Sequence, residues 1–216
     1  MVVLQHRNFG LGNFINCTPT IWAHYLATGD KPKVYFESQY VRDCFDDRLM
    51  CVDILELPVE NYDLSSEWIN FDVPDYKYIN RKAGFETKYM TYPPLWMNKQ
   101  SNRRLAVVLN GCANPDKDHT KKMTPEFMDA VISELSGYEV VRYGNIGEDM
   151  VKATQDIYDA QIVVGNDTGL SHFAAMLGKK QIIFWKDTNF IKNMNLNPNC
   201  TYSKTNWMAD FKKWLC

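Results

Sequence analysis

The sequence predicts an α/β protein made of two small halves, each built around a parallel sheet. Apolar segments of strand length alternate with segments of helical periodicity at the start of the chain, and the alternation restarts after residue 104. A polar, charged stretch at residues 99–104 separates the two runs. We therefore expect an N-terminal domain at residues 1–100 and a C-terminal domain at residues 101–216. The carboxyl ends of their strands should face each other across a cleft, where ligands bind in such sheets.

The N-terminal half begins with a short apolar strand and a glycine-bearing turn at residues 8–12. The expected elements are strands at 2–4, 33–36 and 52–57 and helices at 14–26 and 40–46. Pro19 lies within the first helical pattern, so either the helix begins near it or a kink occurs there. Gly29 is typical of a helix end. Residues 58–96 are irregular and rich in Tyr, Asp, Asn and Pro.

The C-terminal half repeats the alternation with clearer boundaries. The expected strands lie at 105–109, 138–143, 161–164 and 181–185, and the expected helices at 125–135, 149–158, 170–177 and 207–215. Gly178 follows the third of these helices, where a C-terminal cap belongs. Both halves thus predict parallel strands joined by helices.

Composition excludes several classes of protein. The 216 residues are 45% apolar and 23% charged, as in a soluble globular protein. A net charge of -2 does not indicate attraction of the whole protein to nucleic acid, although it leaves a local basic strip open. Six cysteines occur without a C-x-x-C pair, so no zinc site is expected. No apolar stretch approaches the ~20 residues that span a bilayer, and the first residues do not resemble a signal peptide. We expect a cytoplasmic protein with free thiols and no transmembrane segment.

The strongest functional motif is the run GNDTGLSH at residues 165–172. A strand ends at its first glycine and a helix begins within a few residues, so the backbone amides of the first turn could hold a phosphate. Asp167 is placed to cap that helix. On spacing alone, an ordinary capped helix that binds no ligand explains the motif as well as a phosphate site does. Aspartic proteases share the Asp-Thr-Gly tripeptide but need a second such motif. This sequence has no second copy, so an aspartic protease is not expected. The candidate diphosphate-binding residues are Asp167, Thr168, Gly169, Ser171 and His172.

Three segments resemble glycosyltransferase family 9, which contains the lipopolysaccharide heptosyltransferases and has the GT-B fold. Residues 164–185 are similar to its donor-binding segment. Residues 3–26 resemble its first strand, glycine turn and Thr-Pro-bearing helix, and residues 106–128 resemble the strand and basic turn that open its second domain. The resemblance implies two facing Rossmann-like domains, with acceptor in the first and nucleotide-sugar donor in the second. The chain is shorter than typical members.

The same resemblance implies further donor contacts. Lys121 or Lys122 corresponds to a lysine that meets the donor phosphate, where a point charge is chemically sensible. Glu148 corresponds to an acidic residue that contacts the nucleoside. Each has a simpler explanation, because adjacent lysines are commonly solvated and a carboxylate near a helix start is favoured by the helix dipole.

The catalytic position departs from the family pattern. An aspartate that acts as base follows the second glycine of the first turn in the family, whereas this chain has Asn13 there. A side-chain amide cannot accept that proton. His6 is the first candidate for another base, with Asp30 and Glu37 behind it. Alternatively, catalysis rests on stabilising the departing diphosphate, or the protein binds without transferring.

These features predict a metal-independent, inverting glycosyltransferase that moves a sugar from a nucleotide-diphosphate donor to a hydroxyl acceptor. No cofactor is expected besides the nucleotide sugar. The acceptor stays open between a glycan, a small molecule and a modified nucleic-acid base. The alternatives are a nucleotide-sugar-binding protein without activity, or another nucleotide or phosphosugar enzyme such as an epimerase or hydrolase, because fold alone does not separate these.

Overall fold

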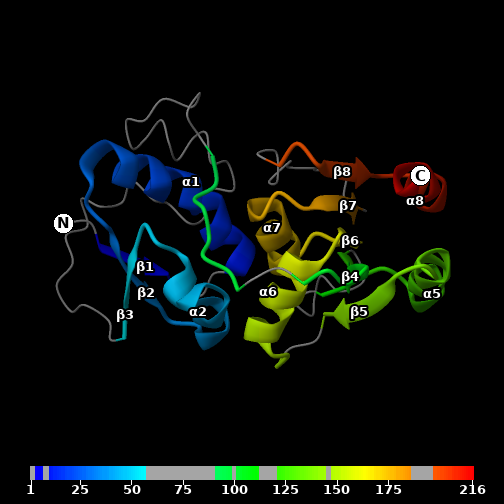
Figure 1. Cartoon of the computed structure of the whole chain (residues 1–216), viewed down its shortest axis with the longest axis horizontal. Coiled ribbons are helices and arrows are strands. Elements are labelled where there is room, and N and C mark those ends of the chain that lie inside the picture. The colour runs from blue at the N-terminus through cyan, green and yellow to red at the C-terminus, as the bar shows by residue number, and fades with distance from the viewer. Residues whose placement is uncertain are drawn as a thin grey trace. The chain divides into compact units, whose positions relative to one another are not determined.

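The computed structural model describes residues 3–6, 10–56, 91–98, 101–111, 121–144, 147–185 and 197–216, without the side chains of residues 3–6 and Asn13. The chain forms two compact units, Met1–Met97 and Asn98–Cys216 (Figure 1). The boundary expected between residues 100 and 101 falls close to the junction of these units. Residues 58–90, within the irregular stretch, lie outside the described residues.

Unit 1 contains a three-stranded parallel sheet in the order β1-β2-β3. Its elements are β1 (Val3–His6), α1 (Leu11–Thr28), β2 (Lys33–Phe36), α2 (Gln39–Phe45), a 3-10 turn (Asp46–Arg48) and β3 (Asp53–Leu55). The core between helices and sheet is aromatic, since the Phe14 ring lies 4.7 Å from that of Phe36 and 5.0 Å from that of Phe45. The strand-helix alternation predicted for this half is therefore present.

Helix α1 continues through Pro19. The ring of a proline removes the N–H that would bond the carbonyl four residues earlier, here that of Ile15. The hydroxyl of Thr18 donates to this carbonyl at 2.8 Å and replaces the missing bond. Since α1 begins at Leu11, Pro19 does not mark its start. Gly29 ends the helix as predicted, with φ 75° and its N–H donating to the Tyr25 carbonyl.

Unit 2 is a five-stranded, wholly parallel sheet in the order β5-β4-β6-β7-β8. The strands are β4 (Leu105–Leu109), β5 (Glu139–Tyr143), β6 (Ile162–Asn166), β7 (Lys180–Phe184) and β8 (Cys200–Ser203). The helices are α5 (Pro125–Glu134), α6 (Met150–Asp159), α7 (Gly169–Met176) and α8 (Trp207–Leu215). Helices α6 and α7 cover one face and α5 and α8 the other (Figure 1). The sequence did not predict β8.

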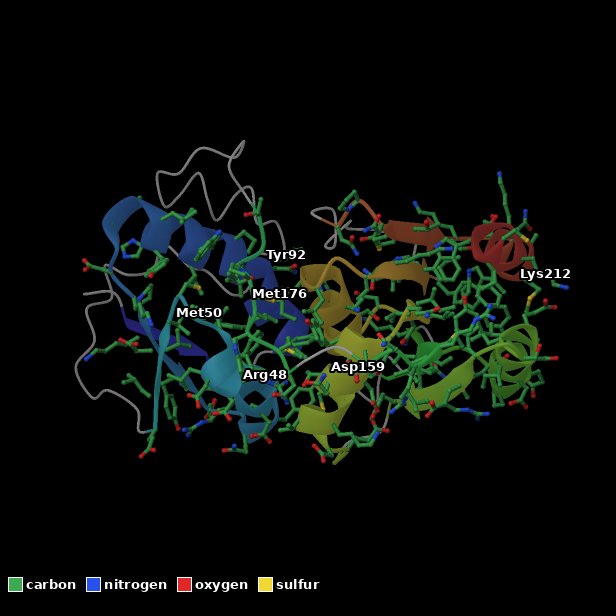
Figure 2. The ribbon with its side chains drawn as sticks, in the orientation of Figure 1. Arg48, Met50, Tyr92, Asp159, Met176 and Lys212 are labelled. Carbon is green, nitrogen blue, oxygen red and sulfur yellow. The ribbon has the colours of Figure 1, made fainter. Side chains whose placement is uncertain are left out.

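The central strands of unit 2 explain its strong apolar signal. Every residue of β4 and β6 is buried, as expected of strands covered on both faces. On the α5 and α8 side, the Phe184 ring lies 4.9 Å from that of Phe127. An ion pair of 2.8 Å between Lys212 and Glu134 joins the outer ends of these helices; Figure 2 shows Lys212. A rigid core therefore positions the strand ends.

The described residues contain neither a membrane-spanning helix nor a cluster of metal ligands. Across the described ranges, no helix has the length and apolar character needed to cross a bilayer. Within the same residues, no three His, Cys, Asp or Glu side chains gather as metal ligands. The cysteines at positions 17, 44, 51, 200 and 216 are free thiols.

Candidate functional site

The strand order of unit 2 creates a switch point between β4 and β6. The chain passes from β4 to β5 on one side, and β6 then pairs on the other side of β4. In parallel α/β sheets, the connections diverge at such a point and leave a crevice outside the carboxyl ends of the two strands. Leu109 pairs with Gly165 in the register of β4 and β6. The GNDTG run therefore lies at the position where this fold binds ligands.

Glycine is required here because backbones approach closely. A Cβ atom on Gly165 would lie 2.6 Å from the carbonyl oxygen of Leu109. A Cβ on Gly144, directly after β5, would lie 2.7 Å from the carbonyl oxygen of Asn110. Real Cβ contacts do not reach these distances, so the ends of β4, β5 and β6 meet main chain against main chain. Backbone atoms therefore fill the space between these strand ends at the switch point.

Helix α7 begins at Gly169, with Thr168 as its N-cap. The Thr168 hydroxyl accepts from the Ser171 N–H at 3.3 Å, so the prediction that Asp167 caps this helix is wrong. Ser171 is fully buried, and its hydroxyl donates to the Asn166 carbonyl at 2.6 Å, which closes the turn. The amides of Gly169 and Leu170 fall in the first turn, where a helix offers donors and partial positive charge.

Asp167 forms an ion pair with Lys121 and a hydrogen bond with His172 instead of a cap. Its Oδ2 lies 2.9 Å from Lys121 Nζ, and its Oδ1 lies 3.2 Å from His172 Nε2. The side chains of Asp167 and His172 are only 10% and 6% exposed, and that of Lys121 is 34% exposed. Burial by itself raises the pKa of the Asp167 carboxyl, but the hydrogen bond and charge of His172 and the charge of Lys121 outweigh it and lower that pKa. Asp167 is therefore an anion at neutral pH.

The structure distinguishes between the two predicted lysines. Lys121 reaches the switch point, where its Nζ contacts Asp167 and lies 5.9 Å from the centre of the Trp185 ring. Lys122 is partly buried. Of the two, Lys121 is the lysine whose ammonium lies beside Asp167 at the start of α7.

Glu148 has a defined partner at the neighbouring strand end. Both of its carboxylate oxygens accept the Gly144 N–H, at 3.1 and 2.9 Å. It lies before Asp149, the N-cap of α6, whose carboxylate accepts the Lys152 N–H at 2.9 Å. Glu148 therefore holds the turn after β5, at the same sheet edge as Asp167.

Two asparagines that the sequence analysis did not name brace this edge. Asn110 accepts the Met123 N–H at 2.7 Å and donates to the Met123 carbonyl at 3.1 Å. Asn166 donates to the carbonyls of Gly111 and Lys121, at 2.9 and 3.0 Å. Asn166 lies within the GNDTG run and Asn110 follows a buried strand, but no local pattern indicated that either side chain would join separate segments.

Two buried atoms at this edge lack a partner within the described part of the chain, namely Nδ1 of His172 and Oδ1 of Asn166. Buried polar atoms in proteins are nearly always hydrogen-bonded. Their hydrogen bonds are therefore not supplied by the described residues.

The candidate base and its neighbours belong to unit 1. The backbone of His6 ends β1, opposite Phe36 of β2, and Asn13 lies in the first turn of α1; the side chains of both lie outside the described residues. Glu37 follows β2 and is exposed at the carboxyl edge of the sheet. Asp30 is exposed between α1 and β2, at the amino edge. The structure thus places Glu37, and not Asp30, at the edge where His6 ends.

Comparisons with known proteins agree with the predicted resemblance. The family model described as glycosyltransferase family 9 (heptosyltransferase) matches residues 148–214. These residues run from Glu148 through the switch point to α8, so the sequence match includes Asp167, Thr168 and His172. No curated protein matches the chain in sequence.

Solved structures match the whole fold. A family 9 glycosyltransferase from Veillonella parvula has a TM-score of 0.69 at 10% identity, over 99% of this chain and 88% of that one. The Escherichia coli heptosyltransferase WaaC with ADP has a TM-score of 0.67 at 13% identity, over 99% of both chains. The glycosyltransferase TibC from E. coli H10407 has a TM-score of 0.66 at 12% identity, over 95% of this chain but 63% of its own length.

Fold and sequence therefore point the same way, although the sequence match covers less than half of the chain. WaaC has also been solved with ADP-2-deoxy-2-fluoro heptose, and TibC with ADP-D-beta-D-heptose. The predicted resemblance is confirmed: the chain has the fold of the GT-B heptosyltransferases, its residues 148–214 match glycosyltransferase family 9, and together these findings support a glycosyltransferase.

Proposed function

We propose that this chain binds the diphosphate of a nucleotide sugar at the switch point of unit 2 and transfers the sugar to a hydroxyl acceptor. The observation that carries the proposal is the group formed by Lys121, Asp167 and His172 at the start of α7. Asp167 and His172 come from the β6–α7 turn and Lys121 from a segment 46 positions earlier, and the three side chains meet where a doubly wound sheet binds its ligand.

The charges at this place suit a diphosphate. Lys121 supplies an ammonium as a point charge, and the first-turn amides of α7 supply donors at the positive end of a helix. Asp167 alone would repel phosphate, but its ion pairs leave the three side chains neutral when His172 is neutral and positive when His172 is protonated. The departing nucleoside diphosphate gains negative charge during transfer, so the same groups would stabilise the transition state.

We propose metal-independent transfer, in which the Lys121 ammonium and the first-turn amides of α7 contact the diphosphate in place of a metal ion. We also propose inversion at the sugar carbon, which follows from the family resemblance. Related structures contain ADP or an ADP-sugar, so an ADP-sugar is the first donor to test. The proposed acceptor is a hydroxyl of a glycan, a small molecule or a modified base, and His6 stays the candidate to deprotonate it.

A second function is favoured by one residue. Asn13 stands where a base is expected, and an amide cannot take a proton from an acceptor. The chain could then bind a nucleotide sugar without transferring it. Incubation of ADP-sugars with candidate acceptors, followed by assay of released ADP, distinguishes these functions. Activity gained in Asn13→Asp but absent in the wild type would favour the binding protein.

Donor binding is tested by thermal unfolding with ADP, UDP, GDP, CDP and dTDP, each without added metal. A ligand that binds only the folded protein raises the melting temperature according to RT ln(1 + [L]/Kd). We expect one nucleotide to stabilise the wild type and to lose this effect in Lys121→Met. The control is Lys212→Met, which removes a lysine paired with Glu134 on the far side of the sheet. Absence of a shift with all five nucleotides in the wild type would overturn the proposal.

A further inference from the structure

The side-chain amide of Asn166 joins two separate parts of the site. Its Nδ2 donates to the carbonyls of Gly111 and Lys121, at 2.9 and 3.0 Å, and the residue is fully buried. Both partners are acceptors, so the NH2 group must face them, and a carboxylate of the same shape could not make either bond. The end of β6 is thereby tied to the end of β4 and to the backbone of Lys121.

Asn110 ties the same segment from β4. It bonds the N–H and the carbonyl of Met123, two residues beyond Lys121. The β4–β6 register, in which Leu109 faces Gly165, sets the ends of the two strands side by side. The backbone around Lys121 is therefore held at two points by groups that the sheet itself positions.

This tether matters because lysine has a long, flexible stem and loses much rotamer freedom when its ammonium is held in one place. The Lys121 ammonium meets the buried Asp167 carboxylate at 2.9 Å. Asp167 directly follows Asn166, so two adjacent residues hold the backbone and the ammonium of this lysine. We propose that Asn166 is a positioning residue that sets the Lys121 ammonium against the donor diphosphate. The proposal rests on the function proposed above.

A buried asparagine can also act only on stability, and the chain offers a matched control. Asn197 is buried, donates to the Lys179 carbonyl at 2.9 Å and accepts the Asn199 N–H at 3.0 Å. It precedes β8, at the amino edge of the same sheet. Asn197→Ala therefore removes comparable hydrogen bonds in the same unit without touching the switch point.

The first experiment needs no ligand. Reductive methylation followed by peptide mass spectrometry gives the modification rate of Lys121 relative to Lys213, an exposed lysine of α8. An amine held against a carboxylate reacts more slowly than one in open solvent. We expect this ratio to rise severalfold in Asn166→Ala and to stay at the wild-type value in Asn197→Ala. An unchanged ratio in Asn166→Ala, or an equal rise in both variants, would overturn the positioning role. Asn166→Ser is the second variant if the alanine protein does not fold.

The second experiment is a double-mutant cycle on diphosphate affinity. Inorganic pyrophosphate is the probe, because it carries the diphosphate without a nucleoside or sugar. We expect Asn166→Ala to weaken binding about tenfold in the wild-type background, the size of one lost charge-assisted contact. In the Lys121→Met background the same substitution should leave the pyrophosphate affinity unchanged, because Asn166 acts on the ligand only by positioning Lys121. Additive losses would contradict the proposal.

The two experiments separate the inference from the function on which it rests. If neither pyrophosphate nor any nucleotide binds the wild type, the proposed function fails, whatever the labelling shows. If a diphosphate binds and Lys121→Met weakens it, but Asn166→Ala changes neither labelling nor affinity, the function stands and the positioning role is wrong.

Discussion

The carboxylate of Asp167 receives the ammonium of Lys121 at 2.9 Å, although 46 positions separate these residues in the chain. The two meet because β4 and β6 are adjacent parallel strands, so the segments that follow them share one edge of the sheet. His172 contacts the other oxygen of the same carboxylate. A buried anion is thus held between two basic side chains at the switch point.

Replacement of Lys121 by methionine should lower both stability and nucleotide affinity. The buried Asp167 carboxylate then keeps only His172 as a partner, so the unfolding free energy should fall by about 1–3 kcal/mol. Nucleotide affinity should fall about tenfold or more, because a charge-assisted contact to phosphate is lost. Isothermal titration and urea unfolding measure the two effects, and a large loss of stability with unchanged affinity would contradict the assignment.

The free energy of unfolding should fall at acid pH, in part because Asp167 becomes protonated. Its pKa is lowered in the folded state, so it stabilises the fold fully above its unfolded value of about 3.9. This contribution is lost as the pH falls below that value through the folded pKa. Urea unfolding at pH 7 and pH 3 should therefore show a larger loss for the wild type than for Asp167→Asn.

Asp156 contributes in the same direction, because Lys152 and Tyr143 outweigh its burial and lower its pKa too. Asp156→Asn is therefore the parallel variant, and the double variant should show the smallest acid sensitivity. An equal acid loss in the wild type and Asp167→Asn would mean that Lys121 and His172 do not hold an ionised carboxylate.

Gly165→Ala should destabilise unit 2 strongly. The added Cβ would lie 2.6 Å from the Leu109 carbonyl, so β4 and β6 must separate, at a cost of about 3 kcal/mol. Gly137→Ala is the matched control, because its Cβ would meet only the Arg104 guanidinium at 3.5 Å, an ordinary contact. We expect that control to lie within about 0.5 kcal/mol of the wild type in urea unfolding. Similar losses for both variants would contradict the close approach.

Tyr143 should ionise only in strong base. Burial and its 2.5 Å hydrogen bond to Asp156 raise its pKa to about 12. Since this pKa is raised, stability from the neutral phenol is present below the unfolded value of about 10 and is lost as the pH rises toward 12. The difference in absorbance at the phenolate band between wild type and Tyr143→Phe isolates this group. Asp156→Asn should remove part of the shift and Lys212→Met none of it.

Much of unit 2 was predictable from local pattern. The buried strand β4 is apolar throughout and β6 is apolar up to Gly165, because helices cover both faces, and α7 begins within the run that predicted its start. The edge strand β8 was missed because it is short and only one of its residues is buried, so it carries little apolar signal. Pro19 was misleading as a possible helix start, since the hydroxyl of Thr18 replaces the bond that proline removes.

The sequence by itself determined the order of strands and helices, the glycines at the strand ends and the position of the GNDTG run, because burial periodicity and turn chemistry are local properties. Only the tertiary structure decided that Thr168 caps α7, that Asp167 is an ion-paired anion and that Lys121 is the lysine beside it. Aspartate and threonine cap helices equally well in isolation. The choice between them depends on which cation the adjacent strand brings to the same edge, and that is set by strand register, not by neighbouring residues.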